Sequence, residues 1–266
     1  VPACQSIIKK AVVDRMAAHY GVSQLPETGT KHQIRFSIMK DDVAIGLDTS
    51  GEGLYKRGYR AVGVEAPLRE TLAAALVTLS RYRGKDPFCD PFCGSGTIPI
   101  EAALIAKNRA PGLDRSFAAQ KWKNMDSKLW LEAGDEAMDK EFHGHYDIWG
   151  GDIDPAAVEL ARHNAELAGV EDCIRFEVAD AGKFHRDSEY GQLVTNPPYG
   201  ERLLEKKEAE DLYRMFGAAL RDLPPKWRVL VLSSHTEFDR FFGRTADKKR
   251  KLYNGMIKCD AFMYGR

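Results

Sequence analysis

The stretch Asp90-Pro91-Phe92-Cys93-Gly94-Ser95-Gly96-Thr97 decides how the rest of the chain is interpreted. It follows a short apolar run and precedes a segment rich in Ala, Ile and Leu, residues 98–106, that we expect to be a helix. A glycine-rich turn between a strand and a helix lets backbone amides approach a ligand closely, because a side chain at either glycine would block the approach. The pattern favours a nucleotide-like ligand, and a tight structural turn accounts for the two glycines equally well.

The composition limits the classes of protein to consider. With 266 residues, 44% of them hydrophobic, the chain is long enough for a well-buried core and one or two domains. The formal net charge is +0, so a nucleic acid would have to be held by a local basic patch. The five cysteines are scattered without a C-x-x-C pair, which predicts no disulfide framework, no metal site and a reducing, cytoplasmic setting. No apolar run reaches the roughly 18 residues of a membrane span.

Residues 1–60 follow a different pattern from the remainder. Residues 5–19 predict an amphipathic helix, and the alternating stretches 32–39 and 43–48 predict a hairpin. So short a segment has little core of its own. We place a linker at 49–60, where tyrosines alternate with Lys and Arg; this mixture suits a solvated loop or, alternatively, contact with RNA.

From residue 61 onward, predicted strands and helices alternate. The expected strands are 87–90, 146–152, 173–180, 192–196 and 227–233; the expected helices are 67–79, 98–108, 156–168 and 209–223. Residues 110–145 form a long connection with helices of its own, and 251–264 form a closing antiparallel hairpin around Asn254-Gly255. Repeated strand-helix units predict a mostly parallel sheet covered on both faces, which binds ligands beyond the carboxyl ends of its strands.

Polar side chains follow four of these strands. They are Asp90, the pair Asp152 and Asp154, Asp180, and Asn196. The carboxylate of Asp152 can accept hydrogen bonds from the two ribose hydroxyls of a nucleoside. About 60 residues separate Asp152 from the glycines, against roughly 20 in the dinucleotide fingerprint, and this spacing argues against a nicotinamide enzyme unless the long connection is an insertion.

The segment Thr195-Asn-Pro-Pro-Tyr-Gly200 is the most specific feature of the chain. Two successive prolines restrict the backbone and leave carbonyl groups free to accept hydrogen bonds. The amide of Asn196 adds an acceptor for an amino group, and the ring of Tyr199 adds a surface on which a base can stack. The segment therefore indicates chemistry on a planar exocyclic amine.

Together these motifs resemble the amino-methyltransferase branch of the Rossmann-like S-adenosylmethionine enzymes, and the resemblance implies an α/β fold with a mostly parallel seven-stranded sheet and a C-terminal antiparallel hairpin, preceded by a partial THUMP-like α+β segment. More specifically, the chain is similar to the THUMP-containing methyltransferases that form 2-methylguanosine in large-subunit ribosomal RNA, a family once labelled adenine-specific DNA methylase. The strings that carry this resemblance are Pro2-Ala-Cys-Gln-Ser6, Asp48-Thr-Ser-Gly51, Lys56-Arg-Gly-Tyr-Arg60, Ala66-Pro-Leu-Arg-Glu-Thr71, Ile98-Pro-Ile-Glu-Ala102 and Asn196-Pro-Pro-Tyr-Gly-Glu-Arg202.

The resemblance implies a role for each site residue. S-adenosylmethionine would be held at its methionine and sugar side by Asp90, Phe92, Gly94, Ser95 and Gly96, with Asp90 near the ammonium and Thr71 closing that end, helped by Arg69 or Glu70. Asp152 would hold the ribose hydroxyls, Ile153 would pack on the adenine, and Asp180 would accept from the adenine amine. Asn196 and the carbonyl of Pro197 would accept from the target amine, and Tyr199 would stack on the flipped base.

The implied organisation is a C-terminal part of a THUMP-like RNA-binding domain with a linker at 1–60, and a methyltransferase domain at 61–266. In the family a ferredoxin-like segment and a complete THUMP domain come first, so we expect this chain to be a fragment. The expected substrate is a guanine amine in large-subunit ribosomal RNA. Adenine methylation in DNA or RNA, guanine methylation in tRNA, and a non-catalytic RNA-binding module stay open.

Overall fold

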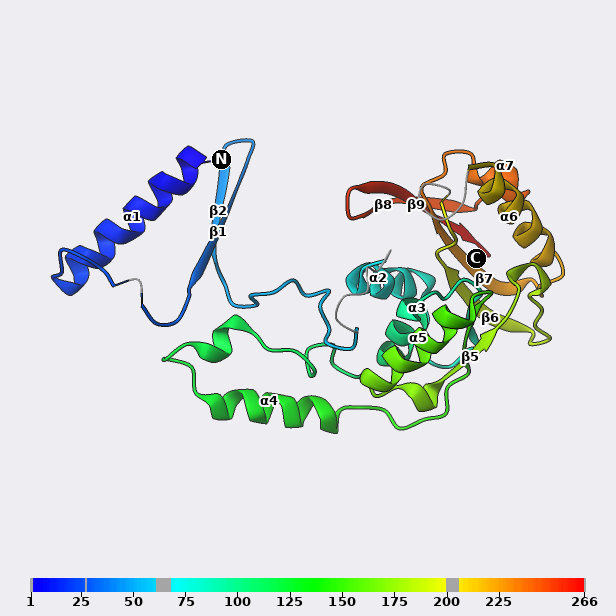
Figure 1. The fold of residues 1–266 in the computed structure, drawn as a ribbon, viewed down its shortest axis with the longest axis horizontal. Helices are drawn as coiled ribbons and strands as arrows, with labels where there is room; N and C mark the ends of the chain where they lie inside the picture. The colour runs from blue at the N-terminus through cyan, green and yellow to red at the C-terminus, as the bar shows by residue number, and fades with distance from the viewer. Residues whose placement is uncertain (1, 27, 61–67, 200–205, 266) are drawn as a thin grey trace. The chain divides into compact units, whose positions relative to one another are not determined.

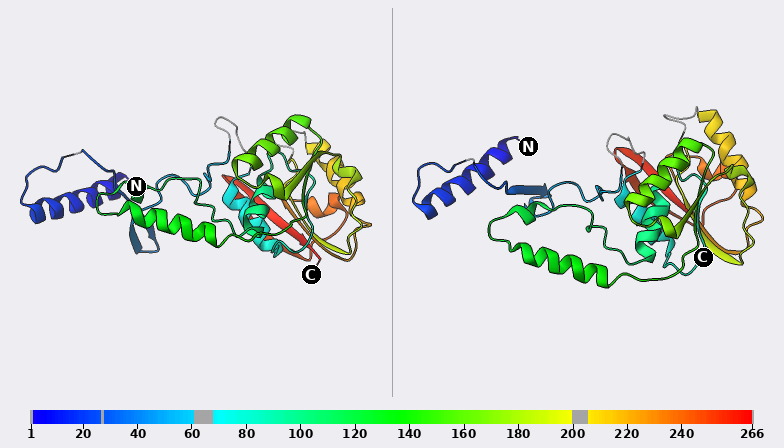
Figure 2. Two further views of the ribbon diagram at one scale, coloured as in Figure 1. Left: turned by 90° about the horizontal axis from the view of Figure 1, so that it is seen from below. Right: turned by 60° about the horizontal axis from the view of Figure 1, so that its bottom comes forward.

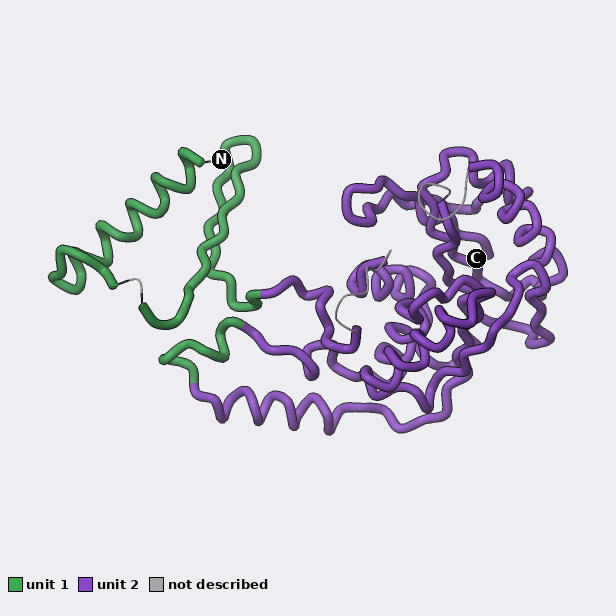
Figure 3. Tube along the Cα trace, viewed as in Figure 1, with its two compact units in different colours: residues 1–51, 118–125 green, residues 52–117, 126–266 purple. Residues whose placement is uncertain are grey.

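The computed structural model describes residues 2–26, 28–60, 68–199 and 206–265. It divides into two compact units, coloured separately in Figure 3: Val1–Gly51 with Ala118–Met125, and Glu52–Phe117 with Asp126–Arg266. The predicted helix start at Pro67 and the predicted Gly200 after the Pro-Pro-Tyr run lie outside the described residues. No helix among the described residues combines the length and the apolar composition that crossing a membrane requires.

The first unit contains the predicted helix and hairpin. Its elements are α1 (Pro2–Tyr20), β1 (Gln33–Met39), β2 (Asp42–Asp48) and the short 3-10 helix η1 (Ala118–Lys121). None of the described residues in α1, β1 or β2 is buried, which confirms that this segment has little core of its own. The segment 118–125 joins the unit through the hydroxyl of Thr30, which donates to the carbonyl of Lys121 (3.0 Å), and through the rings of His32 and Trp122, 4.8 Å apart.

The second unit is built on a seven-stranded sheet, shown in Figures 1 and 2. Its strands are β3 (Phe88–Asp90), β4 (Ile148–Asp152), β5 (Ile174–Val178), β6 (Tyr190–Thr195), β7 (Lys226–Ser233), β8 (Lys248–Asn254) and β9 (Ile257–Tyr264). The order is β5-β4-β3-β6-β7-β9-β8; the first five strands run parallel, and β9 runs antiparallel to both of its neighbours. This confirms the predicted fold class, and the chain order reverses between β3 and β6.

Alternate residues of the strands serve two separate cores, as the period of a strand requires. Phe88 and Ile148 point into one core, whereas their neighbours Cys89 and Trp149 point into the other. The first core is covered by α2 (Glu70–Ser80), α3 (Thr97–Ala106) and α5 (Pro155–Leu167); the second by α6 (Lys206–Ala219) and α7 (Phe238–Phe242). The sheet therefore lies between two helical layers (Figure 1). In open sheets of this kind, ligands bind beyond the carboxyl ends of the strands.

The long connection between α3 and β4 has a helix of its own, as expected. This is α4 (Ser127–Asp139), whose first turn is capped by the carboxylate of Asp126 accepting from the amide of Lys128 (2.9 Å). The ring of Trp130 stacks on Phe117, with centroids 5.5 Å apart. Two further 3-10 helices, η2 (Glu171–Cys173) and η3 (Ala181–Lys183), flank β5. The short helix α7 was not expected from the sequence.

Two of the three cations of the predicted linker, Arg57 and Arg60, turn inward, whereas Lys56 is exposed; the two arginines favour the structural interpretation of that segment over RNA contact. Arg57 pairs with Glu101 at 3.4 Å, and Tyr59, only 3% exposed, donates its hydroxyl to the same carboxylate. Arg60 pairs with Glu70 at 3.1 Å. Buried charges of this kind are compensated by partners within the protein and are not presented to a ligand on the surface.

Candidate active site

The glycine-rich turn joins β3 to α3 at the middle of the carboxyl edge. Gly96 has a φ of +82°, and a Cβ there would lie 2.9 Å from the Cβ of Ala161 and 3.1 Å from the ring of Phe176. Gly94 also has a positive φ, +50°, yet a Cβ there would meet nothing within 4 Å. Gly96 is therefore required for packing of the turn on α5, whereas the backbone at Gly94 borders open space that a ligand can enter.

Three hydrogen bonds fix this turn to the neighbouring elements, and a fourth orients the carboxylate of Asp152 that takes part in one of them. The side chain of Asn164, on α5, donates to the carbonyl of Ser95 (2.9 Å). The amide of Cys93 donates to the carbonyl of Gly151 (2.9 Å). The carboxylate of Asp152 accepts from the amide of Gly94 (2.9 Å) and, through its other oxygen, from the amide of Asp154 (3.0 Å).

Asp152 thus lies directly against the turn. Each carboxylate oxygen can accept more than one hydrogen bond, so Asp152 keeps acceptor capacity for ribose hydroxyls. Ile153, the next residue, is 72% exposed, so its side chain is available to pack on a planar group. Asp180 follows β5 at the same edge and caps η3 by accepting from the amide of Gly182 (2.9 Å).

Asp90 is the most perturbed carboxylate at this edge. It is 1% exposed, and its Oδ1 accepts from the hydroxyl of Thr195 (2.6 Å) and the amide of Phe92 (3.1 Å). Its Oδ2 is buried without a hydrogen-bond partner among the described residues. Burial raises the pKa of Asp90 to about 7, against the lowering effect of these two donors, and the nearby Asp152 raises it further. A cationic group arriving at Oδ2 would supply the missing partner.

The hydrogen bond from Thr195 to Asp90 also joins the end of β6 to the glycine-rich turn after β3. Thr195 is the last residue of β6, so Asn196 follows it at the switch point beside β3. Asn196 is half-buried, and its Oδ1 accepts a hydrogen bond from the hydroxyl of Tyr199. Burial raises the pKa of Tyr199 above its usual range, which keeps this hydroxyl a donor. The structure therefore adds to the predicted stacking role of Tyr199 a contact that orients Asn196.

Tyr213 supports the Pro-Pro-Tyr segment from behind and was not identified from the sequence. Its side chain on α6 is fully buried, and its hydroxyl donates to the carbonyl of Pro198 (2.7 Å). The hydroxyl of Ser233, at the end of β7, lies 3.5 Å from that of Tyr213. An aromatic residue within a helix signals packing, and only the folded chain shows that its hydroxyl holds a loop carbonyl.

The first turn of α2 is linked to the glycine-rich turn through Arg60. Its guanidinium pairs with Glu70 and donates to the hydroxyl of Thr97 (2.8 Å), which lies 3.4 Å from the hydroxyl of Ser95. Thr71 is exposed on that turn of α2. The structure thus connects the start of α2 to the predicted cofactor residues by way of Glu70, whereas Thr71 makes no hydrogen bond recorded among the described residues. Phe92 packs its ring edgewise on Phe216, with centroids 5.0 Å apart.

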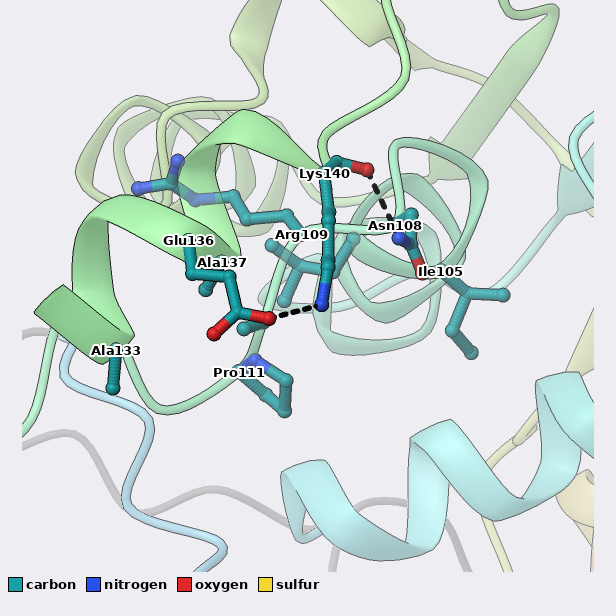
Figure 4. Close-up of a pocket in the computed structure, with 10 residues that line it drawn as sticks. Ile105, Asn108, Arg109, Pro111, Ala133, Glu136, Ala137 and Lys140 are labelled. Carbon is teal, nitrogen blue, oxygen red and sulfur yellow. Dashed lines mark hydrogen bonds and ion pairs between the residues drawn. The ribbon is translucent and has the colours of Figure 1, made fainter.

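A separate cavity of about 530 Å³ lies between the end of α3, the following loop and α4 (Figure 4). Several of its polar side chains are already paired: Lys140 pairs with Glu136 at 2.5 Å, and its carbonyl accepts a hydrogen bond from Asn108 (3.0 Å). None of the predicted site residues lines it. Across the part of the chain that the structure describes, no group of three His, Cys, Asp or Glu side chains is placed to hold a metal ion.

Comparison with known proteins gives a consistent result. Residues 57–262 match the family model described as RMKL-like, methyltransferase domain. The chain is 46% identical over 270 residues to "Putative RNA methyltransferase YpsC" of Bacillus subtilis, covering 99% of this chain and 69% of that protein. It is 39% identical over 262 residues to "Ribosomal RNA large subunit methyltransferase K/L" of Psychromonas ingrahamii, covering 95% of this chain and 35% of that protein. The chain thus spans about a third of the length of the K/L protein.

Solved structures that are similar to this chain lead to the same family as the sequence matches. A "possible methylase" from Clostridium difficile 630 superposes with a TM-score of 0.93 at 45% identity, covering 99% of this chain and 70% of that one. SMU.472, described as "a putative methyltransferase complexed with SAH", gives a TM-score of 0.90 at 41% identity, covering 100% of this chain and 71% of that one. TrmN from Thermus thermophilus, at 23% identity and a TM-score of 0.68 over 97% of this chain and 66% of that one, shares the fold. These matches confirm the predicted methyltransferase fold and its cofactor, S-adenosylmethionine. The chain belongs to the family of RMKL-like methyltransferase domains.

Proposed function

We propose that this chain transfers a methyl group from S-adenosylmethionine to the exocyclic amine of a guanine in structured RNA, namely large-subunit ribosomal RNA. The observation that carries the proposal is the 2.6 Å hydrogen bond between Thr195 and Asp90. Asp90 is the carboxylate proposed to bind the cofactor, and Asn196, which is proposed to accept hydrogen bonds from the target amine, directly follows Thr195. The hydrogen bond therefore holds the two proposed binding residues close together. Methyl donor and methyl acceptor would then meet over a single switch point of the sheet.

The cofactor end is supported by the chemistry of its donors and acceptors. The unpartnered Oδ2 of Asp90 suits the ammonium of the methionine moiety, the open backbone at Gly94 suits its close approach, and Asp152 suits the ribose. Thr71, Phe92, Ser95, Gly96, Ile153 and Asp180 complete the proposed set. The relative SMU.472 was solved with SAH, which supports the same assignment here. When bound, S-adenosylmethionine supplies a methyl group that is already activated for transfer.

Residues 196–199 are proposed to act by positioning the target amine. The Oδ1 of Asn196 and the carbonyl of Pro197 accept from the two hydrogens of the amine, which localises the lone pair of its nitrogen and directs it toward the methyl group. The hydroxyl of Tyr199 keeps Asn196 oriented, and its ring offers a face for the extruded base. Tyr213 holds the carbonyl of Pro198, so the backbone of the segment is fixed before the base arrives.

RNA is favoured as the substrate by the relatives. The Bacillus subtilis relative is named "Putative RNA methyltransferase YpsC", and the Psychromonas relative is named a ribosomal RNA large subunit methyltransferase. A structural relative from Listeria monocytogenes carries the description "predicted N6-adenine-specific DNA methylase" at 45% identity, with a TM-score of 0.91 over 100% of this chain and 70% of that one, so adenine is the second candidate. A non-catalytic module would not need the acceptor pair at Asn196 and Pro197 beside an intact carboxylate edge.

Residues 1–60 are proposed to be the C-terminal part of a THUMP-like RNA-binding domain with its linker, and 61–266 the methyltransferase domain. The exposed apolar side chains of the first unit support a segment that packs against further structure. Among them are Ile38, Met39, Val43 and Ile45, from 52% to 72% exposed. RNA capture would then involve this segment, and the chemistry would belong to the second unit.

The proposal is tested by mass spectrometry of nucleosides from large-subunit ribosomal RNA of a strain lacking the gene. We expect 2-methylguanosine to fall in that strain and to be restored by the wild-type gene but not by an Asn196→Ala version. An unchanged 2-methylguanosine level, or full restoration by Asn196→Ala, would refute the proposed activity. A loss of N6-methyladenosine in its place would establish the adenine alternative.

A further inference from the structure

The β8–β9 hairpin reaches past the sheet at the edge that holds the site. Ser233, the last residue of β7, pairs with Asp260 of β9, and Asp260 pairs with Lys251 of β8. The residues between Lys251 and Asp260 therefore continue beyond the carboxyl end of β7 and form the hairpin tip, residues 251–260. Figure 1 shows this hairpin projecting from the sheet. Because β6 and β7 are parallel and Thr195 pairs with Val231, the tip stands beside the segment that begins at Asn196.

One face of the tip touches that segment. Leu252 and Cys259 form a cross-strand pair and so share a face, and both contribute to the core under α2 and α3. On this face the thiol of Cys259 lies 3.7 Å from the hydroxyl of Tyr199. The tip is thereby held against the residue that is proposed to stack on the target base.

The opposite face of the tip points away from this core and is exposed. It carries Tyr253, 61% exposed, with its cross-strand partner Lys258, and it also carries Lys251, two residues before Tyr253 on β8. Tyr253 is a stacking surface, and the two lysines are phosphate-binding groups. A carboxylate, Asp260, lies opposite Lys251, and it is the only acidic residue from Lys248 to Tyr264, against five Lys and Arg.

Protection of an edge strand explains only part of this pattern. Lys and Arg on β8 would discourage pairing with another chain, since β8 is the outer strand. That function requires neither Lys258, which lies on the inner strand β9, nor an exposed Tyr253 at the tip, nor Met256, which is 97% exposed. In a chain of net charge +0, a basic and aromatic projection beside the acceptor segment calls for an anionic, stackable partner.

We propose that the outer face of this tip, formed by Lys251, Tyr253 and Lys258, is the RNA-docking surface of the methyltransferase unit. It binds the unpaired strand that flanks the target nucleotide: the lysines contact phosphates, and Tyr253 stacks on a neighbouring base. Through its contact with Tyr199, the inner face of the same tip sets the flanking strand at a fixed distance from the pocket. The inference rests on the proposed function for its choice of RNA.

The test compares two double variants that each remove two cations from the full chain. Lys251→Ala with Lys258→Ala alters the tip, and Arg221→Ala with Lys226→Ala alters the opposite edge of the sheet, where β7 begins. The probe is large-subunit ribosomal RNA from a strain lacking the gene, titrated at several salt concentrations. The slope of log K against log salt is negative, and loss of two phosphate contacts should reduce its magnitude by about 1.4 for a single strand.

We expect the tip variant to bind this RNA about tenfold more weakly in ~0.1 M salt and to show the smaller slope, with unchanged S-adenosylmethionine affinity. Tyr253→Ala should weaken binding by about tenfold without changing the slope, since stacking carries no charge. The opposite-edge variant should match the wild type. A tip variant with wild-type affinity and slope, or an equal loss in both double variants, would overturn the docking surface. Because binding is measured without turnover, a wild-type chain that binds but does not methylate would instead refute the proposed function.

Discussion

Asp90 is the residue at which pH acts most directly on the site. The folded chain raises its pKa from 3.8 to about 7, mainly by burial, so the folded state favours the protonated carboxyl. Its contribution to the free energy of unfolding is therefore fully present below pH 3.8 and is lost as the pH rises through about 7. A motif containing Asp before a glycine-rich turn predicts the position of the carboxylate but not this burial, which depends on the packing of β4 and β6 around β3.

Asp90→Asn should remove this pH dependence. In the absence of cofactor, the variant should gain unfolding free energy relative to the wild type between pH 5 and pH 8, because the buried negative charge is gone. Urea denaturation of both proteins at the two pH values measures the difference. If the variant and the wild type differ by the same amount at pH 5 and pH 8, Asp90 does not titrate in this range.

Asn196 is the residue proposed to contact the reacting amine. Asn196→Ala should lower kcat by about 10² or more, on the scale of losing one preorganised polar group in an active site, and should leave cofactor affinity nearly unchanged. Single-turnover methylation and calorimetric titration with S-adenosylmethionine give the two values. Equal losses in both would show that Asn196 holds the cofactor and not the acceptor.

Tyr199→Phe is the matched variant for the hydrogen bond to Asn196. It keeps the ring for stacking and removes the donor, so we expect a smaller fall in kcat than for Asn196→Ala and little change in RNA affinity. Tyr199→Ala should lower both. The same kcat for Tyr199→Phe and wild type would show that Asn196 is oriented without this contact. The sequence predicted the aromatic face of Tyr199, whereas the bond to Asn196 depends on a side-chain torsion that the motif does not specify.

At the scale of elements, the glycine-rich turn separates packing from binding. Gly96→Ala would place a Cβ 2.9 Å from that of Ala161 at a φ of +82°, so the loss of stability should be about 2–4 kcal/mol. Gly94→Ala meets no atom within 4 Å, so it should lose only about 1–2 kcal/mol from its positive φ while weakening cofactor binding. Thermal unfolding and calorimetry separate the two. Equal stability losses with unchanged cofactor affinity at Gly94 would remove its proposed role.

The elements themselves were largely predictable because their signals are local. Alternating apolar residues and the polar residues at the strand ends located β3, β4, β5, β6 and β7, and Asn254-Gly255 located the final hairpin. The inward turn of Arg57 and Arg60 was not predictable, because their partners Glu101 and Glu70 lie on later helices. The support from Tyr213 was missed for the same reason: hydrogen bonds between distant elements leave no periodic signal.

At the scale of the whole molecule, positive and negative side chains are concentrated in different regions. The net charge of +0 conceals a hairpin with five Lys and Arg and a carboxyl edge rich in Asp. The Asp-rich edge suits a cationic cofactor and the basic hairpin an anionic substrate, so the two ligands would be sorted by local fields. The sequence also did not show that 118–125 would belong to the first unit, because that association joins residues far apart in the chain.

The most direct test of the account is a methyl-transfer reaction with purified components. The chain is incubated with isotopically labelled S-adenosylmethionine and large-subunit ribosomal RNA from a strain lacking the gene, and the nucleosides are then separated and identified by mass spectrometry. The account predicts label in 2-methylguanosine, and its absence from that nucleoside with Asn196→Ala. Label in N6-methyladenosine, or in no nucleoside although the chain binds both S-adenosylmethionine and the RNA, would contradict it.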